Sequence, residues 1–243
     1  MSYESHLNKT LKNAKRFLEI LKLYHRYESI GINHVPKNGR ALLIVNHSLA
    51  TYDGFLLGLE IFDNIGRLPQ GLGDDMLFRF PFLKEWMTDL GVMPASKENA
   101  KKLLRDGHIL GIAPGGMRES LRPFRERYQI KWAKRKGFVK LALETETPII
   151  LAACPAADRI FKVYSNKLTA LSYKYIKFPM PIFKGFGPTF IPRPVKLVHY
   201  ISEKIVPPKL NIITEEDVDA FHEVILVEMR KLMVLARNHR TSF

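Results

Sequence analysis

The sequence is poor in cysteine, in long apolar runs and in acidic residues. A single cysteine, Cys154, excludes an internal disulfide and any metal site built from cysteines alone. It lies in an apolar run before Pro155, which favours a small buried residue over a catalytic thiol. No stretch reaches the roughly 18 apolar residues that a membrane-spanning helix needs. We therefore expect a protein that is soluble or lies on a membrane surface.

The shortage of acidic residues leaves a large positive charge. Lys and Arg number 38 against 24 Asp and Glu, which gives a formal net charge of +14. Such an excess favours an acidic partner: nucleic acid, anionic lipid or a phosphorylated cofactor. The densest basic segment runs from Arg118 to Lys140, where nine Lys and Arg accompany two glutamates. A segment of this kind is usually a solvated face, but it also suits contacts with phosphate groups.

The length and the order of apolar runs predict one α/β domain. With 243 residues, 46% of them hydrophobic, the chain can bury a sizeable core. Short buried strands alternate with helices, which favours a mainly parallel central sheet flanked by helices. We expect an N-terminal amphipathic helix within residues 1–27 and one domain over residues 28–243, closed by a C-terminal helix. The first helix either packs on the domain or lies in a membrane interface.

The first candidate site follows a predicted strand over Ala41–Val45. This apolar run ends in Asn46-His47-Ser48, and a helix is predicted from Tyr52 to Phe62, with Thr51 as its N-cap. Asp53 then lies just inside the helix and His47 at the end of the strand. Open α/β sheets place their chemistry at this carboxyl edge.

His47 and Asp53 suit general acid–base chemistry. Histidine exchanges a proton near neutral pH, and a carboxylate bound to one ring nitrogen leaves the other free to act as a base. The pairing requires residues 46–50 to form a loop, because positions six apart on a helix do not share a face. In the alternative interpretation, Asp53 only complements the helix dipole and His47 is an ordinary histidine at a strand end.

A second candidate site follows a predicted strand over His108–Ala113. This strand runs into Pro114-Gly115-Gly116, and the paired glycines let the backbone approach a ligand closely. Arg118 adds a rigid positive fork that suits phosphate or carboxylate.

Together the two stretches resemble the glycerolipid acyltransferase superfamily of lysophosphatidic acid acyltransferase-like enzymes. That family has an Asn-His followed by a nearby Asp, and a later Phe-Pro-Glu-Gly-Thr-Arg-Ser. Residues 28–47 are similar to its first motif with the lead-in, residues 90–100 to its second, and residues 147–152 stand where its fourth belongs. The resemblance covers about residues 28–205.

Two departures point to one branch of that superfamily. Five residues, Ser48–Tyr52, separate His47 from Asp53, where the family has four. Pro114-Gly-Gly-Met-Arg118-Glu119 replaces Pro-Glu-Gly-Thr-Arg. Both changes are similar to the branch that contains the diacylglycerol acyltransferases and related bacterial proteins.

The resemblance implies an O-acyltransferase that moves a fatty acyl chain from acyl-CoA or acyl-carrier protein to a hydroxyl of a glycerolipid or lysophospholipid. It implies His47 as general base oriented by Asp53, and substrate binding by Gly115, Gly116, Arg118 and Glu119. No metal, no cofactor beyond the acyl co-substrate and no nucleic acid are expected. The implied location is peripheral, on the cytoplasmic side of an anionic membrane surface.

Other interpretations stay open. A basic nucleic-acid-binding protein would explain the charge, and a catalytically silent lipid-binding relative would explain the altered glycine motif. Residues 161–190 alternate aromatics with lysines in predicted irregular loops, which suits either lipid headgroups or single-stranded nucleic acid. A helix predicted over Met76–Leu90 either lines an acyl-chain tunnel, by resemblance, or belongs to the core. Asp74 and Asp75 are an improbable metal site, because neighbouring side chains usually diverge.

Overall fold

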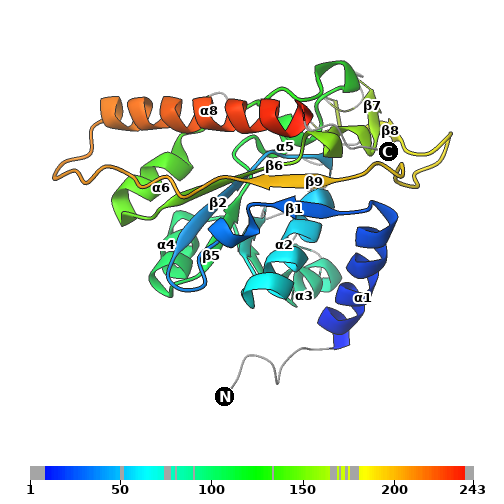
Figure 1. The fold of residues 1–243 in the computed structure, drawn as a ribbon, viewed down its shortest axis with the longest axis horizontal. Helices are drawn as coiled ribbons and strands as arrows, with labels where there is room; N and C mark the ends of the chain where they lie inside the picture. Colours follow the sequence, from blue (N-terminus) through cyan, green and yellow to red (C-terminus); the bar gives the residue numbers. More distant parts are fainter. Residues whose placement is uncertain are drawn as a thin grey trace.

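A seven-stranded sheet between two layers of helices forms the body of the protein (Figure 1). The computed structural model describes residues 9–49, 52–73, 78–79, 81–89, 91–132, 134–164, 169, 171–172, 175 and 181–238. The prediction of an α/β fold with a mainly parallel central sheet is confirmed. Within these residues, no helix is both long enough and apolar enough to cross a bilayer.

The sheet is parallel over five strands and reverses direction at one edge. β2 (Ala41–Val45) lies at the centre between β5 (Ile109–Ile112) and β6 (Ile149–Ala153), and is parallel to both. Beyond β5 come β3 (Gln70–Gly73) and β4 (Val92–Pro94), also parallel. On the other side β9 (Val198–Ile201) runs antiparallel to β6, and β1 (Glu28–Ile30) is parallel to β9.

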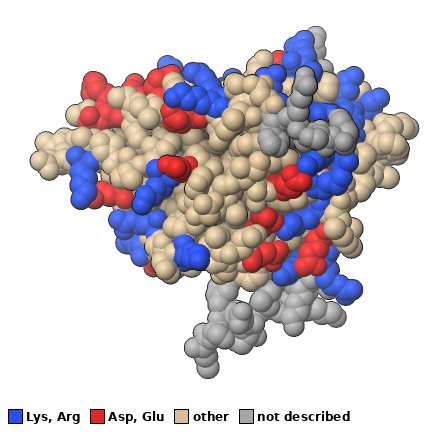
Figure 2. Space-filling model, in the orientation of Figure 1, with Lys and Arg blue, Asp and Glu red and all other residues tan. Residues whose placement is uncertain are grey.

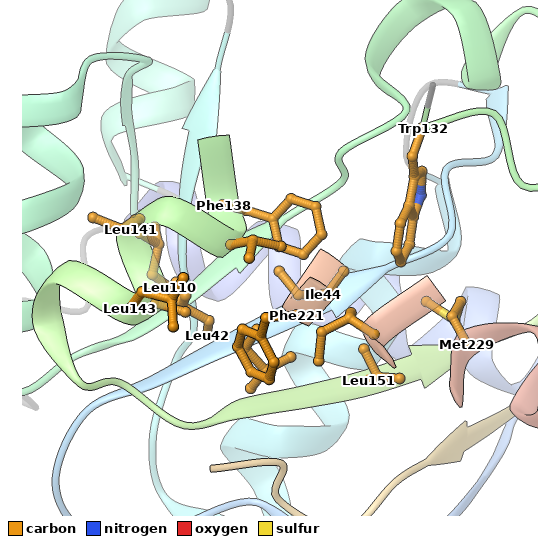
Figure 3. Packing of buried hydrophobic residues seen from close by; sticks show 14 of the residues in the cluster. Leu42, Ile44, Leu110, Trp132, Phe138, Leu141, Leu143, Leu151, Phe221 and Met229 are labelled. Carbon is orange, nitrogen blue, oxygen red and sulfur yellow. The ribbon is translucent and has the colours of Figure 1, made fainter. Parts of the chain in front are cut away.

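Alternate side chains of the central strands feed two separate cores. Leu42 and Ile44 of β2 pack on one face against three helices, α4 (Lys97–Arg105), α6 (Gly137–Thr145) and α8 (Glu215–Asn238). Figure 3 shows Trp132 and Phe138 in this cluster, close to Met229 and Phe221 of α8. Ala41, Leu43 and Val45 face the other way, toward α2 (Tyr52–Ile65). A strand buried on both faces has to be apolar throughout, as β2 is.

α1 (Lys9–Tyr24) packs on the domain beside α2. Lys15 of α1 pairs with Asp63 of α2 at 3.0 Å, and Lys22 pairs with Glu60. α3 (Pro81–Asp89) occupies part of the predicted Met76–Leu90 helix on the same side of the sheet. In Figure 1, α1, α2 and α3 lie below the sheet while α8 crosses above it.

Short helices and a second sheet complete the fold. The helices are η2 (Ile32–His34), α5 (Gly116–Ser120), η5 (Phe124–Glu126) and η6 (Pro155–Arg159). β7 (Lys162–Tyr164) and β8 (Ile182–Lys184) pair antiparallel. The prediction of irregular loops throughout residues 161–190 is therefore wrong at these two strands. Thr51, Asp74 and Asp75 lie outside the described residues.

Local capping signals fix the helix ends as predicted. The hydroxyl oxygen of Ser96 accepts a hydrogen bond from the N–H of Asn99 at 3.0 Å and starts α4. Before α8, the N–H of Thr214 donates to the Asp217 carboxylate (2.9 Å), and the N–H of Asp217 donates to the Thr214 hydroxyl (3.2 Å). This reciprocal pair is a capping box.

Candidate active site

The two motifs meet at the carboxyl edge of the sheet. β2 leads into His47 and β5 leads into the glycine turn, and the two strands are paired, with Ile44 opposite Ile112. The backbone N–H of His47 donates a hydrogen bond to the carboxylate of Glu119 on α5 at 3.2 Å. A residue of the second motif therefore positions the backbone of the first.

The glycine turn makes room for the Glu119 side chain. Glu119 has no exposed surface, and its carboxylate also accepts a hydrogen bond from the N–H of Lys131 at 3.1 Å. A Cβ atom at Gly115 would overlap the side chain of Glu119. Burial raises the pKa of Glu119, against the opposing pull of Arg122 and the two backbone N–H groups.

Gly116 and Arg118 differ in how far their polar groups are engaged within the protein. Gly116 has φ +48°, and a Cβ there would lie 2.6 Å from Nη1 of Arg135. Its N–H donates to the carbonyl of Ala113 at 3.0 Å, so this group is engaged within the turn. The Arg135 guanidinium donates to the carbonyl of Gly115. Arg118 is exposed beside the turn and is available to a ligand.

The ring of His47 is held in one tautomer. Its Nδ1 lies 2.8 Å from the carbonyl oxygen of Ser48. A carbonyl only accepts, so Nδ1 carries the proton and Nε2 keeps a lone pair. Burial lowers the pKa of His47, and the charges of Arg122 and Arg135 act in the same direction. The Ser48 carbonyl and the Asp53 charge oppose this shift without reversing it.

Asp53 is buried next to this loop but takes other partners. Its carboxylate accepts a hydrogen bond from the Ser48 hydroxyl and lies 3.4 Å from Nε2 of His199. Burial acts to raise the pKa of Asp53, but its contacts with His199 and Ser48 outweigh that effect and lower it. The resemblance implies that Asp53 orients His47, but in the structure Nδ1–H of His47 donates its hydrogen bond to the Ser48 carbonyl. The negative charge of Asp53 acts to raise the pKa of His47.

His199 and Tyr27 extend this buried network, and neither was found from the sequence. His199, on β9, has no exposed surface, and its Nδ1 lies 2.8 Å from the hydroxyl of Tyr27. Potential ligand atoms of Asp53, Cys154 and His199 lie within 4.8 Å of one another, a set that could hold a metal ion. The contacts with Ser48 and Tyr27 favour a hydrogen-bonded network. No local pattern marks a histidine within a late strand.

Asn46 ties the histidine loop to the next strand. Its side-chain oxygen accepts a hydrogen bond from the backbone N–H of Cys154, just after β6, at 2.8 Å. Cys154 itself is fully buried, and burial raises the pKa of its thiol. The prediction that Cys154 is a small buried residue is confirmed.

Much of the basic segment is neutralised within the protein. Nε of Arg122 donates to the carboxylate of Asp158 at 3.1 Å, and both side chains are buried. Ion pairs nearer the surface hold further members of the segment: Lys131 with Glu126, Lys136 with Asp219, and Lys140 with Glu215. Less of the charge of this segment is therefore unpaired than the sequence alone indicates.

Comparison with known proteins decides the family. Residues 60–243 match the family model described as diacylglycerol acyltransferase. The chain belongs to this family. The predicted membership of the glycerolipid acyltransferase superfamily is thereby confirmed. The matched residues begin after His47 and Asp53, so the role of that pair stays a prediction.

The chain is also similar to curated proteins that are longer than it is. A "DGAT1/2-independent enzyme synthesizing storage lipids" from Bos taurus is 29% identical over 208 residues, which are 84% of this chain and 60% of that protein. The protein of the same name from Homo sapiens is 30% identical over 185 residues, 75% of this chain and 55% of the relative. The chain thus spans somewhat more than half the length of these relatives.

A solved structure shares the fold of this family member. The crystal structure of the 1-acyl-sn-glycerophosphate (LPA) acyltransferase PlsC from Thermotoga maritima superposes with a TM-score of 0.60. The match covers 95% of this chain and 83% of that one, at 15% sequence identity. At this identity the likeness shows the fold alone.

Proposed function

We propose that this family member is an O-acyltransferase that moves a fatty acyl chain from acyl-CoA, or from acyl-carrier protein, to a hydroxyl of a glycerolipid or lysophospholipid. One observation carries the proposal: the Nδ1 proton of His47 is bound by the Ser48 carbonyl, which leaves Nε2 as a base. The lowered pKa of His47 keeps the ring neutral near pH 7. The glycine turn lies beside it, joined through Glu119.

The chemistry is a single acyl transfer. Nε2 of His47 removes the proton of the acceptor hydroxyl as its oxygen attacks the thioester carbonyl. The carbonyl oxygen becomes negative and is stabilised by the backbone N–H of Gly115 and by Arg118. The C–S bond then breaks, the acyl ester remains, and the leaving thiolate takes up the proton from His47.

Buried partners stabilise the charge that His47 gains. The carboxylate of Asp53 favours the imidazolium through its charge, and Ser48 and His199 hold that carboxylate in place. His199 is a positioning residue, because it touches Asp53 and not the reacting atoms. Glu119 also positions: it fixes the backbone of His47, and its full burial keeps it from contacting substrate directly.

We further propose that the acceptor is met at an anionic membrane surface. Phe17, Ile20 and Leu23 of α1 are 60–80% exposed, as are Phe186 and Phe190 after β8, at 61% and 71%. The two groups lie on one side of the molecule, where the hydroxyl of Tyr24 on α1 donates to the carbonyl of Pro192 at 2.6 Å. Lys and Arg side chains lie along this right-hand side in Figure 2, with Asp and Glu side chains among them in its lower part.

Sedimentation with phosphatidylglycerol vesicles tests the membrane proposal. Leu23→Glu and Phe190→Glu each place a charge in the exposed apolar group and should reduce binding. Val234→Glu on α8, at a position 53% exposed, is the control and should bind normally. Equal binding by all three variants would contradict this surface.

The activity itself is tested with labelled acyl-CoA and a panel of acceptors. Lysophospholipids, monoacylglycerol and diacylglycerol are incubated with the wild type, and the products are resolved by lipid class. Acylation of any of them supports the proposal and identifies the acceptor. If no acceptor is acylated from either acyl-CoA or acyl-carrier protein, the proposed activity is wrong.

A further inference from the structure

Three cations from separate segments surround the ring of Phe124. The guanidinium carbon of Arg127 lies 4.7 Å from the ring centre, that of Arg193 lies 5.9 Å away, and Nζ of Lys162 lies 5.8 Å away. Arg127 follows η5, Lys162 begins β7, and Arg193 precedes β9. Three positive charges gathered around one ring create a local positive potential, which would attract an anion.

No carboxylate of the described residues neutralises this cluster. Within the described part of the chain, none of Arg127, Lys162 and Arg193 has a carboxylate oxygen within 4 Å. Arg193 donates from Nε to the carbonyl of Gly185 at 3.0 Å, and Arg127 donates weakly to the carbonyl of Phe124. These carbonyls orient the guanidinium groups but do not cancel their charge.

The cluster borders a hollow that reaches the catalytic loop. The hollow is a small opening at the surface, and Phe124 and Arg127 lie in its wall. Leu49, two residues after His47, and Ser120, next to Glu119, also line it. The acidic member of the wall, Asp158, is bound by Arg122 and by the N–H of Tyr128. Arg127 is the member of the cluster that lines the hollow, and it shares that lining with Leu49 of the histidine loop.

We propose that Arg127, Lys162 and Arg193 bind a phosphate group of a substrate, with Phe124 holding the guanidinium groups in place. This site rests on the proposed function, because its position beside the histidine loop is what makes the bound molecule a substrate. Two guanidinium forks and an ammonium match the oxygens of a phosphate, which accept charge-assisted hydrogen bonds. The phosphate belongs either to the nucleotide end of acyl-CoA or to the headgroup of a phosphorylated acceptor.

A pair of triple variants isolates the site from the general charge of the protein. Arg127→Gln/Lys162→Gln/Arg193→Gln removes three positive charges from the cluster. Arg40→Gln/Lys102→Gln/Arg105→Gln removes three from exposed positions at the opposite edge of the sheet, before β2 and on α4. Calorimetry measures the affinity for CoA and for dephospho-CoA, and steady-state kinetics measure KM for lysophosphatidic acid and for monoacylglycerol.

We expect the cluster variant to lose at least about tenfold in affinity for one phosphate-bearing substrate, because charge-assisted hydrogen bonds are lost. The control should change by about twofold or less, through screened long-range charge only. Weaker CoA binding identifies the nucleotide end, and a higher KM for lysophosphatidic acid alone identifies the headgroup. Equal effects of the two triple variants, or no effect of either, would overturn the site.

CoA binding is measured without turnover, so the two proposals can fail separately. Suppose that the wild type acylates no acceptor, but that the cluster variant binds CoA more weakly than the wild type and the control variant do. The phosphate site then stands and the proposed activity is wrong. If the cluster variant does not fold, Lys162→Gln alone decides, because its ammonium has no hydrogen-bond partner among the described residues. Unchanged affinity for every phosphate-bearing probe in that variant would also overturn the proposal.

Discussion

The carboxylate of Glu119 accepts a hydrogen bond from the backbone N–H of His47 at 3.2 Å. This contact joins the loop after β2 to the helix after β5, two segments 72 residues apart. Because Glu119 is fully buried, the space for its side chain has to be left by its neighbours, and Gly115 leaves it. The glycine turn therefore shapes the position of the histidine as well as the surface that a substrate meets.

Gly115→Ala tests this coupling. The new methyl group would displace the side chain of Glu119, and overpacking of this kind costs about 1–3 kcal/mol of unfolding free energy. Acyl transfer should fall as well, because the backbone of His47 loses its buried acceptor. Gly111→Ala on β5 is the control, since its Cβ would meet only the carbonyl oxygen of Gln70 at 3.6 Å. Denaturant unfolding and activity should separate the two variants, and similar losses in both would contradict the coupling.

The pH dependence follows from the lowered pKa of His47. A general base works when it is unprotonated, so activity is lost as the pH falls through its pKa. We expect the acid limb of kcat/KM to have its midpoint below about 6.5, the ordinary value for histidine. The Asp53 charge raises that pKa, so Asp53→Asn should move the midpoint to still lower pH and reduce kcat. A midpoint above the ordinary value, or one that Asp53→Asn leaves in place, would contradict His47 as the base.

His199 is tested by comparing two replacements. His199→Gln keeps an N–H donor that can reach the carboxylate of Asp53, whereas His199→Leu leaves that buried carboxylate with one partner fewer. We expect kcat for the Leu variant to be at least about tenfold below that for the Gln variant, with KM little changed. Thermal unfolding of both variants provides the control. If kcat follows only the fraction folded, His199 has a structural role and no positioning role.

The ion pair of Arg122 and Asp158 should contribute strongly to stability. Both side chains are at least 94% buried, and removing one partner of such a pair leaves an uncompensated charge, at a cost of about 3–5 kcal/mol. Arg125 is the matched control: it pairs with Glu126 but its side chain is 76% exposed. Arg125→Ala should change the unfolding free energy by about 0.5 kcal/mol or less. Equal destabilisation by Arg122→Ala and Arg125→Ala in urea would contradict the buried pair.

Local signals were sufficient to predict the centre of the fold. The apolar run of β2, the serine cap before α4 and the capping box before α8 each depend on residues a few positions apart. The two motifs were also placed correctly at one sheet edge, because parallel strands end together. The roles of Gly115 and Glu119 were less visible, since a glycine that makes room for a neighbouring side chain looks in sequence like any turn glycine.

Contacts between distant segments could not be predicted. His199 reaches Asp53 because β9 enters the sheet antiparallel to β6, and no periodicity in the sequence gives a strand its direction. Tyr27 and His199 are 172 residues apart. The ion pairs of the basic segment could not be predicted either. Three of its cations pair with Asp158, Asp219 and Glu215, which all lie outside the segment.

The most direct test of His47 as general base is the kcat/KM of His47→Ala for transfer from labelled acyl-CoA to the best acceptor of the panel. General-base assistance contributes about 10²- to 10⁴-fold, so the variant should lose at least about a hundredfold while its thermal unfolding stays close to that of the wild type. A folded His47→Ala protein with wild-type kcat/KM would contradict the account.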